Sequence, residues 1–431
     1  MKRHDTPLSV AEELTKHIPS VLKRVLDPAV GSGSLIWPIC PEFRRQQSRL
    51  VFVDVDKAAI QSVKSDSRFS ELKLAELICA DFLEWSLHPS IGMFDCIVMN
   101  PPFAACRNAL RCIRQSSFVE HDRLVPVEAA FLCRAVDMLE DGGRLLAVLP
   151  SSIIMAMRLR WLRQRIFEFG AVRLVHELPP RSFPRVESRM YLFVFDKAKR
   201  QRKVQLMNHD LIEPEILKVE IQSTSIRERL DFGFHSAKRR LETMKSYSRL
   251  GWFKLGELAE IFRGTVPTPV FNKTIVHTTD YDGSGWTKKC KASRTNKIAG
   301  RITLNKTDLL LKRVGRDSYR SIGTAKRVSG RICSDCVLVI RPADTKEHQR
   351  LLFALKILLS FKWSKPLIER GTGASYISVE SLKDLVVPFN AYKVYPGCFS
   401  KFLEEETTEA DSGERTAISK VVSQIASKVD L

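Results

Sequence analysis

Four consecutive residues, Asn100-Pro101-Pro102-Phe103, have the clearest chemical potential in the sequence, and they follow the apolar run Phe94–Met99. The two prolines fix the backbone and stop a helix from continuing, so the Asn100 carboxamide and the Pro101 carbonyl are held as acceptors. The Phe103 ring can stack on a planar group. Fixed acceptors beside such a ring suit an exocyclic amine, because they bind its hydrogens and aim its lone pair at an electrophile. The alternative is a rigid turn under a loop.

Three further strand ends carry a second set of candidate residues. The glycine-rich run Asp27–Ser34 follows the first apolar strand, and its glycines allow a sharp turn and a close approach to a ligand. This run is not a dinucleotide fingerprint, because Ile36 stands where a third glycine belongs. Asp54, roughly 20 residues beyond, can accept from both ribose hydroxyls, and Asp81 can accept from an adenine amine. Each feature alone could be a turn or a helix cap, but together they favour a bound adenosine compound.

These residues need a sheet that brings strand ends together. Short apolar runs alternate with helical patterns over the first 196 residues, which predicts an α/β fold with a mainly parallel sheet and ligands at its carboxyl edge. The predicted strands are Arg24–Leu26, Arg49–Val53, Leu74–Cys79, Phe94–Met99, Arg144–Leu149, Val172–Glu177 and Met190–Phe195. The predicted helices are Lys57–Val63, Glu128–Leu139 and Leu159–Phe169.

The net charge points to a polyanionic partner. The chain has 431 residues, with 69 Lys and Arg against 49 Asp and Glu, a formal charge of +20. The interval from Lys197 to Arg331 contains 30 basic and 13 acidic residues and therefore carries +17 of this charge. The first residues carry acids and a proline and lead into no apolar segment, so a signal peptide is not expected, and the sequence contains no apolar run of membrane-spanning length. The polyanion is therefore expected to be nucleic acid and not a membrane surface.

A chain of this length is expected to form two domains, since single cores stop growing at roughly 250 to 300 residues. We predict a catalytic domain over 1–196, a polar linker over 197–229 and an α+β domain over 230–431. The apolar stretch Leu351–Leu359 is expected to be a packing helix.

The cysteines and the missing motifs narrow the function further. The ten cysteines are scattered and indicate reduced thiols of a cytoplasmic protein. Cys333 and Cys336 form a lone pair without partners, so no metal site is expected. The sequence has neither an ATP-binding phosphate loop nor a nuclease metal motif. Any coupled cleavage would come from another polypeptide.

Taken in order along the chain, these motifs resemble the gamma-class, TaqI-like adenine-N6 DNA methyltransferases of restriction-modification systems. Thr6-Pro7 resembles the family's N-terminal motif, and Asp27 to Gly33 its first S-adenosylmethionine motif. Asn100 to Phe103 resembles the catalytic motif, although Phe103 stands where Tyr is common. Glu128 to Ile153 resembles the helix, Gly-Gly turn and strand that follow. The resemblance implies a Rossmann-like methyltransferase sheet.

The resemblance also implies roles for individual residues. S-adenosylmethionine would be bound by Thr6, Asp27, Ala29, Gly31, Gly33, Asp54, Asp81, Asn100 and Pro102. The catalytic set would be Asn100, Pro101, Phe103 and Phe183, with the two aromatic rings stacking on an adenine flipped out of duplex DNA. A core position is the alternative for Phe183.

The second half resembles target-recognition domains more loosely, through the Gly264-Thr265, Arg313-Val314-Gly315 and Gly371-Thr372-Gly373 turns and Val387-Pro388. Candidate DNA-binding side chains are basic and lie among glycines, serines or loop residues. They are Arg107, Arg111, Arg313, Arg316, Arg320 and Lys326. A solvated connection or a solvated basic face is the alternative for each of them.

The leading hypothesis is a site-specific DNA adenine methyltransferase acting on double-stranded DNA. We expect it in the bacterial cytoplasm, associated with the nucleoid, with a separately encoded restriction endonuclease as a partner. The alternatives are an RNA adenine or protein-glutamine methyltransferase with the same Asn100–Phe103 site, and a DNA-specificity module without activity.

Overall fold

The chain forms two compact units, Met1–His235 and Ser236–Leu431. The computed structural model describes residues 5–103, 110–180, 182–183, 188–209, 216–246, 248–266, 275–283, 285–287, 303–315, 317–371, 375–407 and 416–429. Within these residues no helix is both long enough and apolar enough to cross a membrane.

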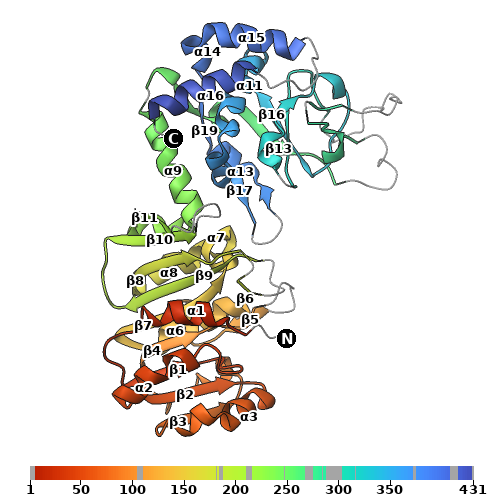
Figure 1. The fold of residues 1–431 in the computed structure, drawn as a ribbon. Helices are drawn as coiled ribbons and strands as arrows, with labels where there is room; N and C mark the ends of the chain where they lie inside the picture. The colour runs from red at the N-terminus through yellow and green to blue at the C-terminus, as the bar shows by residue number, and fades with distance from the viewer. Residues whose placement is uncertain are drawn as a thin grey trace. The chain divides into compact units, whose positions relative to one another are not determined.

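The first unit is built on a nine-stranded sheet in the order β11-β10-β8-β9-β7-β4-β1-β2-β3 (Figure 1). The half from β7 to β3 is parallel, whereas β9 runs antiparallel to both of its neighbours. Its strands are β1 (Arg24–Asp27), β2 (Arg49–Asp54), β3 (Ala75–Cys79), β4 (Phe94–Met99), β7 (Leu139–Pro150), β8 (Gly170–Glu177), β9 (Met190–Lys197), β10 (Lys203–His209) and β11 (Ile216–Gln222). The predicted α/β fold class and all seven predicted strands are confirmed.

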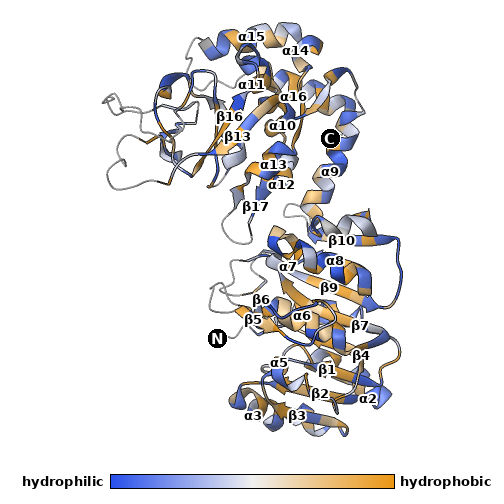
Figure 2. Ribbon diagram, turned by 180° about the vertical axis from the view of Figure 1, so that it is seen from behind, coloured by the Kyte–Doolittle hydropathy of each residue, from blue (hydrophilic) through white to orange (hydrophobic). Residues whose placement is uncertain are grey.

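Alternating apolar residues along each strand build one core on each face of this sheet, and the central strands are hydrophobic over most of their length (Figure 2). One face is covered by α5 (Phe82–Trp85), α6 (Val127–Met138), α7 (Ser151–Met155) and α8 (Arg160–Phe169). The other face is covered by α1 (Leu8–Thr15), the 3-10 turn Trp37–Ile39, α2 (Cys40–Gln46) and α3 (Lys57–Ser65), while the short helix α4 (Ser67–Ser70) follows α3. A small hairpin, β5 (Leu110–Ile113) and β6 (Arg123–Pro126), precedes α6.

The predicted linker over 197–229 is wrong in its described part. β10 pairs in parallel with β8, and β11 pairs with β10, so this polar stretch extends the sheet of the first unit. Its residues Val204 and Leu206 are buried in the core on one face of the sheet, and Met207 is buried in the core on the other face. The chain leaves the first unit through α9 (Phe232–Lys245), which contains the unit boundary.

The second unit has an α+β architecture, as predicted. Its main sheet is antiparallel in the order β13-β16-β14-β15, with β13 (Ala259–Arg263), β14 (Leu309–Lys312), β15 (Gly323–Thr324) and β16 (Val337–Pro342). Two short pairs accompany it, β12 (Trp252–Lys254) with β19 (Val386–Pro388) and β17 (Glu369–Arg370) with β18 (Tyr376–Ile377).

Helices pack on one face of that sheet. At the centre lies α11 (His348–Ser360), in which every residue from Leu351 to Leu359 is buried, so the predicted packing helix is confirmed. The other helices of this unit are α10 (Leu255–Leu258), α12 (Lys365–Ile368), α13 (Val379–Lys383), α14 (Ala391–Val394), α15 (Pro396–Thr407) and α16 (Thr416–Val429).

Candidate active site

Asn100 follows β4 at the carboxyl edge of the sheet, and its side chain contacts the N-terminal segment. Asn100 Nδ2 donates to Thr6 Oγ1 at 2.9 Å, and the Thr6 backbone N–H donates to Ser34 Oγ at 3.2 Å. These two hydrogen bonds connect Asn100, Thr6 and Ser34, which are far apart in the sequence. Because the amide nitrogen faces Thr6, the amide oxygen is the acceptor that Asn100 can present to a substrate amine.

The glycine-rich run is held from two strands. Asp27, the last residue of β1, accepts from the Ala29 N–H at 3.0 Å, and Asp54 Oδ2 accepts from the Gly31 N–H at 2.8 Å. Gly31 has a φ of 61°, in the left-handed region where glycine is favoured. The acid at the end of β2 therefore fixes the position of the loop that follows β1.

The two downstream acids also accept backbone N–H groups of the residues that follow them. The second oxygen of Asp54 accepts from the Asp56 N–H at 2.9 Å, and Asp81 caps α5 by accepting from the Leu83 N–H at 2.9 Å. The cap alternative considered for Asp81 is thus present in the structure. A cap uses one carboxylate oxygen, which leaves the second oxygen of Asp81 available for a ligand.

A cavity of about 390 Å³ connects these strand ends. Nine of the residues predicted to hold cofactor or substrate line it, namely Thr6, Ala29, Gly31, Asp54, Asp81, Asn100, Pro101, Pro102 and Phe103. Arg111, predicted to face DNA, lines it as well. A cavity of this size with a few convergent polar groups is typical of a small-molecule site.

Asp27 lies beneath the cavity wall. Its side chain is 1% exposed, and burial raises the pKa of Asp27 to about 8. Its Oδ2 atom is buried and has no hydrogen-bond partner within the described part of the chain. The next two residues, Pro28 and Ala29, line the cavity. An unsatisfied buried oxygen beside a cavity fits a ligand that brings a hydrogen-bond donor.

The two predicted stacking aromatics differ in their surroundings. Phe103 lines the cavity and is half-buried, whereas Phe183 is 2% exposed and is not among the described residues lining the cavity. Both rings belong to the same apolar cluster. This packing agrees with the alternative considered for Phe183, a core aromatic, while a stacking role remains a prediction.

The cavity also contains apolar residues that we did not predict. Val55 follows Asp54 and is 72% exposed, Phe82 and Leu83 follow Asp81, and Phe131 projects from α6. The sequence could have identified some of these residues, because the residue that follows each acid at a strand end lines the same cavity. These side chains provide the apolar surface that a purine ring requires.

Basic residues in the second unit lie close to aromatic rings. The Arg313 guanidinium lies 5.3 Å from the centre of the Tyr376 ring, and Lys312 Nζ lies 4.8 Å from that of Tyr281. Arg320 and Lys326 are exposed. Arg107 and Arg316, both predicted to bind DNA, lie outside the described residues.

Residues 3–232 match the N-6 DNA Methylase family, which is more than half of the chain. The protein belongs to this family. The match ends within the first unit, which contains every residue that lines the cavity.

Individual relatives are more distant. A tRNA1(Val) (adenine(37)-N6)-methyltransferase of Porphyromonas gingivalis is 29% identical over 144 residues, 32% of this chain and 54% of that protein. The chain thus spans about half the length of this curated relative.

Among solved structures, the type IIL restriction-modification enzyme MmeI, determined in complex with DNA, has a TM-score of 0.57 at 13% identity. The similarity covers 98% of this chain and 71% of that one, and it shows a shared fold. The type IIG restriction endonuclease BpuSI has a TM-score of 0.46 at 12% identity and covers 99% of this chain and 66% of that one.

Proposed function

We propose that the protein is a DNA adenine-N6 methyltransferase that uses S-adenosylmethionine and belongs to the gamma, TaqI-like class. The observation that carries this proposal is that Asn100, Pro101 and Phe103 share one cavity with Asp54, Asp81 and the glycine-rich loop. A site for an adenosine compound and a site for a planar amine would therefore meet at the same sheet edge. Membership of the N-6 DNA Methylase family supports the same chemistry.

The cofactor end of the cavity fits S-adenosylmethionine. Asp54 would accept from the ribose hydroxyls and Asp81 from the adenine amine, while Val55 and Phe82 provide apolar surface for the purine. The buried Oδ2 of Asp27 would accept from the ammonium group of the methionine part. When bound, S-adenosylmethionine supplies an electrophilic methyl group.

At the catalytic end, the chain positions the amine that receives the methyl group. Asn100 Oδ1 and the Pro101 carbonyl would accept its two hydrogens, which directs the nitrogen lone pair toward the methyl carbon. Phe103 would stack on the adenine ring. Stacking worth roughly 1 to 3 kcal/mol per base offsets much of the few kcal/mol needed to flip the base out of a duplex. We keep Phe183 as the second stacking ring in this proposal.

The second unit would serve as the target-recognition domain. Arg313, Arg320 and Lys326 would contact phosphates or base edges, with Arg107, Arg111 and Arg316 as further contacts. Duplex DNA is then the substrate, and the nucleoid is the expected place of action. A restriction endonuclease encoded separately is the partner that such a modification enzyme would have.

RNA adenine methylation is the second candidate function. It is favoured by the relative from Porphyromonas gingivalis, whose similarity is confined to about a third of this chain. The basic second unit lies beyond the family match and argues for a long polyanion, so we prefer DNA. The basic charge of the second unit argues equally against a protein-glutamine substrate.

Product analysis tests the proposal. Plasmid DNA lacking adenine methylation is incubated with the protein and S-adenosylmethionine, digested to nucleosides and separated by chromatography. We expect N6-methyldeoxyadenosine as the product. A methylated cytosine, or no modified nucleoside while the protein binds S-adenosylmethionine, would overturn the assignment; the second outcome is the one a DNA-specificity module would give.

A further inference from the structure

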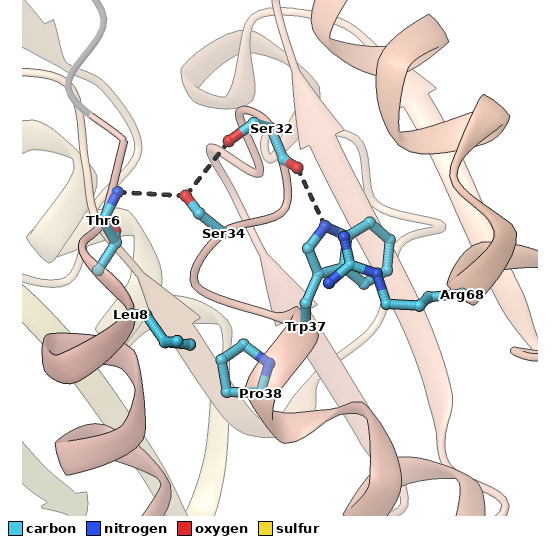
Figure 3. Close-up of a pocket in the computed structure, with 7 residues that line it drawn as sticks. All are labelled: Thr6, Leu8, Ser32, Ser34, Trp37, Pro38 and Arg68. Carbon is cyan, nitrogen blue, oxygen red and sulfur yellow. Dashed lines mark hydrogen bonds between the residues drawn. The ribbon is translucent and has the colours of Figure 1, made fainter.

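An indole ring also contacts the glycine-rich loop. Trp37 Nε1 donates to the Ser32 carbonyl at 3.1 Å (Figure 3). Trp37 is only 8% exposed. Gly33 has a φ of 77°, and a Cβ atom built on it would lie 2.5 Å from Trp37 Cε2. The space that a side chain at position 33 needs is therefore already filled by the indole.

The indole is itself in contact with a basic side chain. The Arg68 guanidinium carbon lies 4.6 Å from the centre of the Trp37 ring, a cation-π distance. Arg68 is oriented by Asp66 through two hydrogen bonds of 2.8 and 2.6 Å. Asp66 also caps α4 through the Arg68 N–H. The contacts thus run from α4 through Arg68 and Trp37 to the loop.

This arrangement borders the cofactor site directly. A second cavity, of about 430 Å³, is lined by Thr6, Leu8, Ser32, Ser34, Trp37, Pro38 and Arg68. Thr6 and Ser34 line the cofactor cavity too, so the glycine-rich loop is the wall between the two cavities. Val30 and Gly33 of this loop are buried, and Ser32 and Ser34 face the second cavity. Several hydrogen bonds hold the loop, among them those from the Gly31 N–H to Asp54 Oδ2 and from the Val30 N–H to the Val53 carbonyl. On the side of the second cavity, Trp37 Nε1 donates to the Ser32 carbonyl and the Thr6 N–H donates to Ser34 Oγ.

We infer that Trp37, supported by Arg68, is a positioning residue that holds the glycine-rich loop in the shape that binds S-adenosylmethionine. This inference rests on the proposed function. Gly33 then serves chiefly to admit the indole, and the residue that contacts the cofactor is Gly31. Loss of the indole lets the loop move into the second cavity, so cofactor affinity falls while the catalytic motif stays in place.

The test uses the full-length protein and three variants, Trp37→Phe, Trp37→Leu and Arg68→Gln. Trp37→Phe keeps a ring against Gly33 but removes the N–H, and we expect the Kd and KM for S-adenosylmethionine to rise about three- to tenfold. Trp37→Leu should have a larger effect and Arg68→Gln a smaller one. Values of kcat and of KM for DNA should stay within about twofold of wild type. A general loss of structure would change these values as well as the affinity for S-adenosylmethionine.

The matched control is another Arg-Trp stack in the same unit, Arg123 over Trp161 at 4.4 Å. Trp161→Phe should leave cofactor affinity unchanged. If wild type binds S-adenosylmethionine and Trp37→Phe and Trp37→Leu bind it equally well, the inference is wrong while the proposed function stands. If wild type itself does not bind it, the proposed function fails first. Equal losses in Trp37→Phe and Trp161→Phe would also reject a specific role for Trp37.

Discussion

The two units place functional groups in different ways. In the first unit, Asp27, Asp54 and Asp81 accept backbone N–H groups at strand or helix ends, so their positions are fixed by the fold. In the second unit, the described candidates for DNA binding are held less firmly: Arg313 stacks on the Tyr376 ring, and Arg320 and Lys326 are exposed. The first unit contains 34 basic and 29 acidic residues, a net +5, whereas the second contains 35 and 20, a net +15.

This difference matches two kinds of task. Methyl transfer requires a few atoms held within fractions of an ångström, which backbone hydrogen bonds at the end of a sheet can provide. Gripping a duplex requires many charges at adaptable positions, because phosphate contacts are numerous and individually weak. Changes in the first unit should therefore affect chemistry, cofactor binding and acid stability, and changes in the second unit should affect DNA affinity.

The largest effect is expected at Asn100. Asn100→Ala removes an acceptor for the target amine, so transfer should fall about 10²- to 10³-fold. Binding of S-adenosylmethionine, measured by calorimetry, should weaken no more than about threefold, since the other strand-end contacts remain. Asn208→Ala, on the distal strand β10, is the control and should keep full turnover. Equal turnover in Asn100→Ala and wild type would refute the catalytic role.

A smaller effect, confined to DNA, is expected in the second unit. The triple variant Arg313→Ala, Arg320→Ala, Lys326→Ala should weaken duplex binding about ten- to a hundredfold and lower the slope of log K against log salt by about one per lost contact. Cofactor affinity should not change. Lys346→Ala, at another exposed lysine of the same unit, should have little effect. An unchanged salt slope in the triple variant would show that these residues do not contact the phosphates.

The folding stability of the protein should depend on pH through Asp27. Its pKa of about 8 means that the folded protein keeps this proton while the unfolded chain loses it above about pH 4. Stability from this group is thus full below pH 4 and declines as pH rises toward 8, by at most about 1.4 kcal/mol per pH unit. Asp27→Asn should raise the unfolding temperature without cofactor at pH 8 and change it little at pH 4.

The same substitution should weaken S-adenosylmethionine binding about tenfold, because the Asp27 carboxyl group can release its proton and pair with an ammonium group as a carboxylate, whereas the amide of asparagine stays neutral. Unfolding is measured by scanning calorimetry and binding by titration calorimetry. A variant that binds as tightly as wild type would exclude Asp27 from the cofactor site, whatever its effect on stability.

The smallest effect is expected at His176, on β8. This side chain is 1% exposed and its ring centre lies 4.8 Å from that of His209. Burial, and then His209, lower the pKa of His176 to about 4. The folded state therefore resists protonation, and stability of about 1 to 3 kcal/mol is lost as pH falls from 6.5 to 4.

In calorimetric scans, the first unit of His176→Phe should lose less stability than wild type as pH falls from 6.5 to 4. His88→Phe, at an exposed histidine, is the control and should lose as much stability as wild type. If His176→Phe and wild type lose the same stability as pH falls, another group controls the loss of stability in acid. Cofactor and DNA affinities at pH 7.5 should be unaffected by either change.

The sequence predicted the catalytic unit closely because its signals are local. Apolar runs such as Phe94–Met99 identify strands, and the acid or asparagine after each run identifies a strand end. Parallel pairing then brings Asn100, Asp54 and Asp81 to one edge without further information.

The sequence was less informative where the place of a residue depends on contacts that only the fold creates. The polar stretch containing Lys203–His209 resembles a linker, yet it becomes a strand because β8 offers it an open edge. The cofactor contact predicted for Gly33 stays a prediction; what the sequence did not reveal is that a Cβ atom at this position would meet the Trp37 ring. Phe183 was placed by resemblance, and its stacking role stays a prediction, while its burial depends on the apolar cluster to which it belongs.

The central claim is that the first unit methylates adenine in DNA delivered by the basic second unit. The most direct test is a competition in which labelled S-adenosylmethionine is offered to the full-length protein with equal nucleotide concentrations of duplex DNA and tRNA. We predict that the label enters DNA as N6-methyladenine. The triple variant at Arg313, Arg320 and Lys326 should incorporate less label into DNA when the DNA concentration is limiting. Label recovered in tRNA, with DNA unlabelled, would contradict the account.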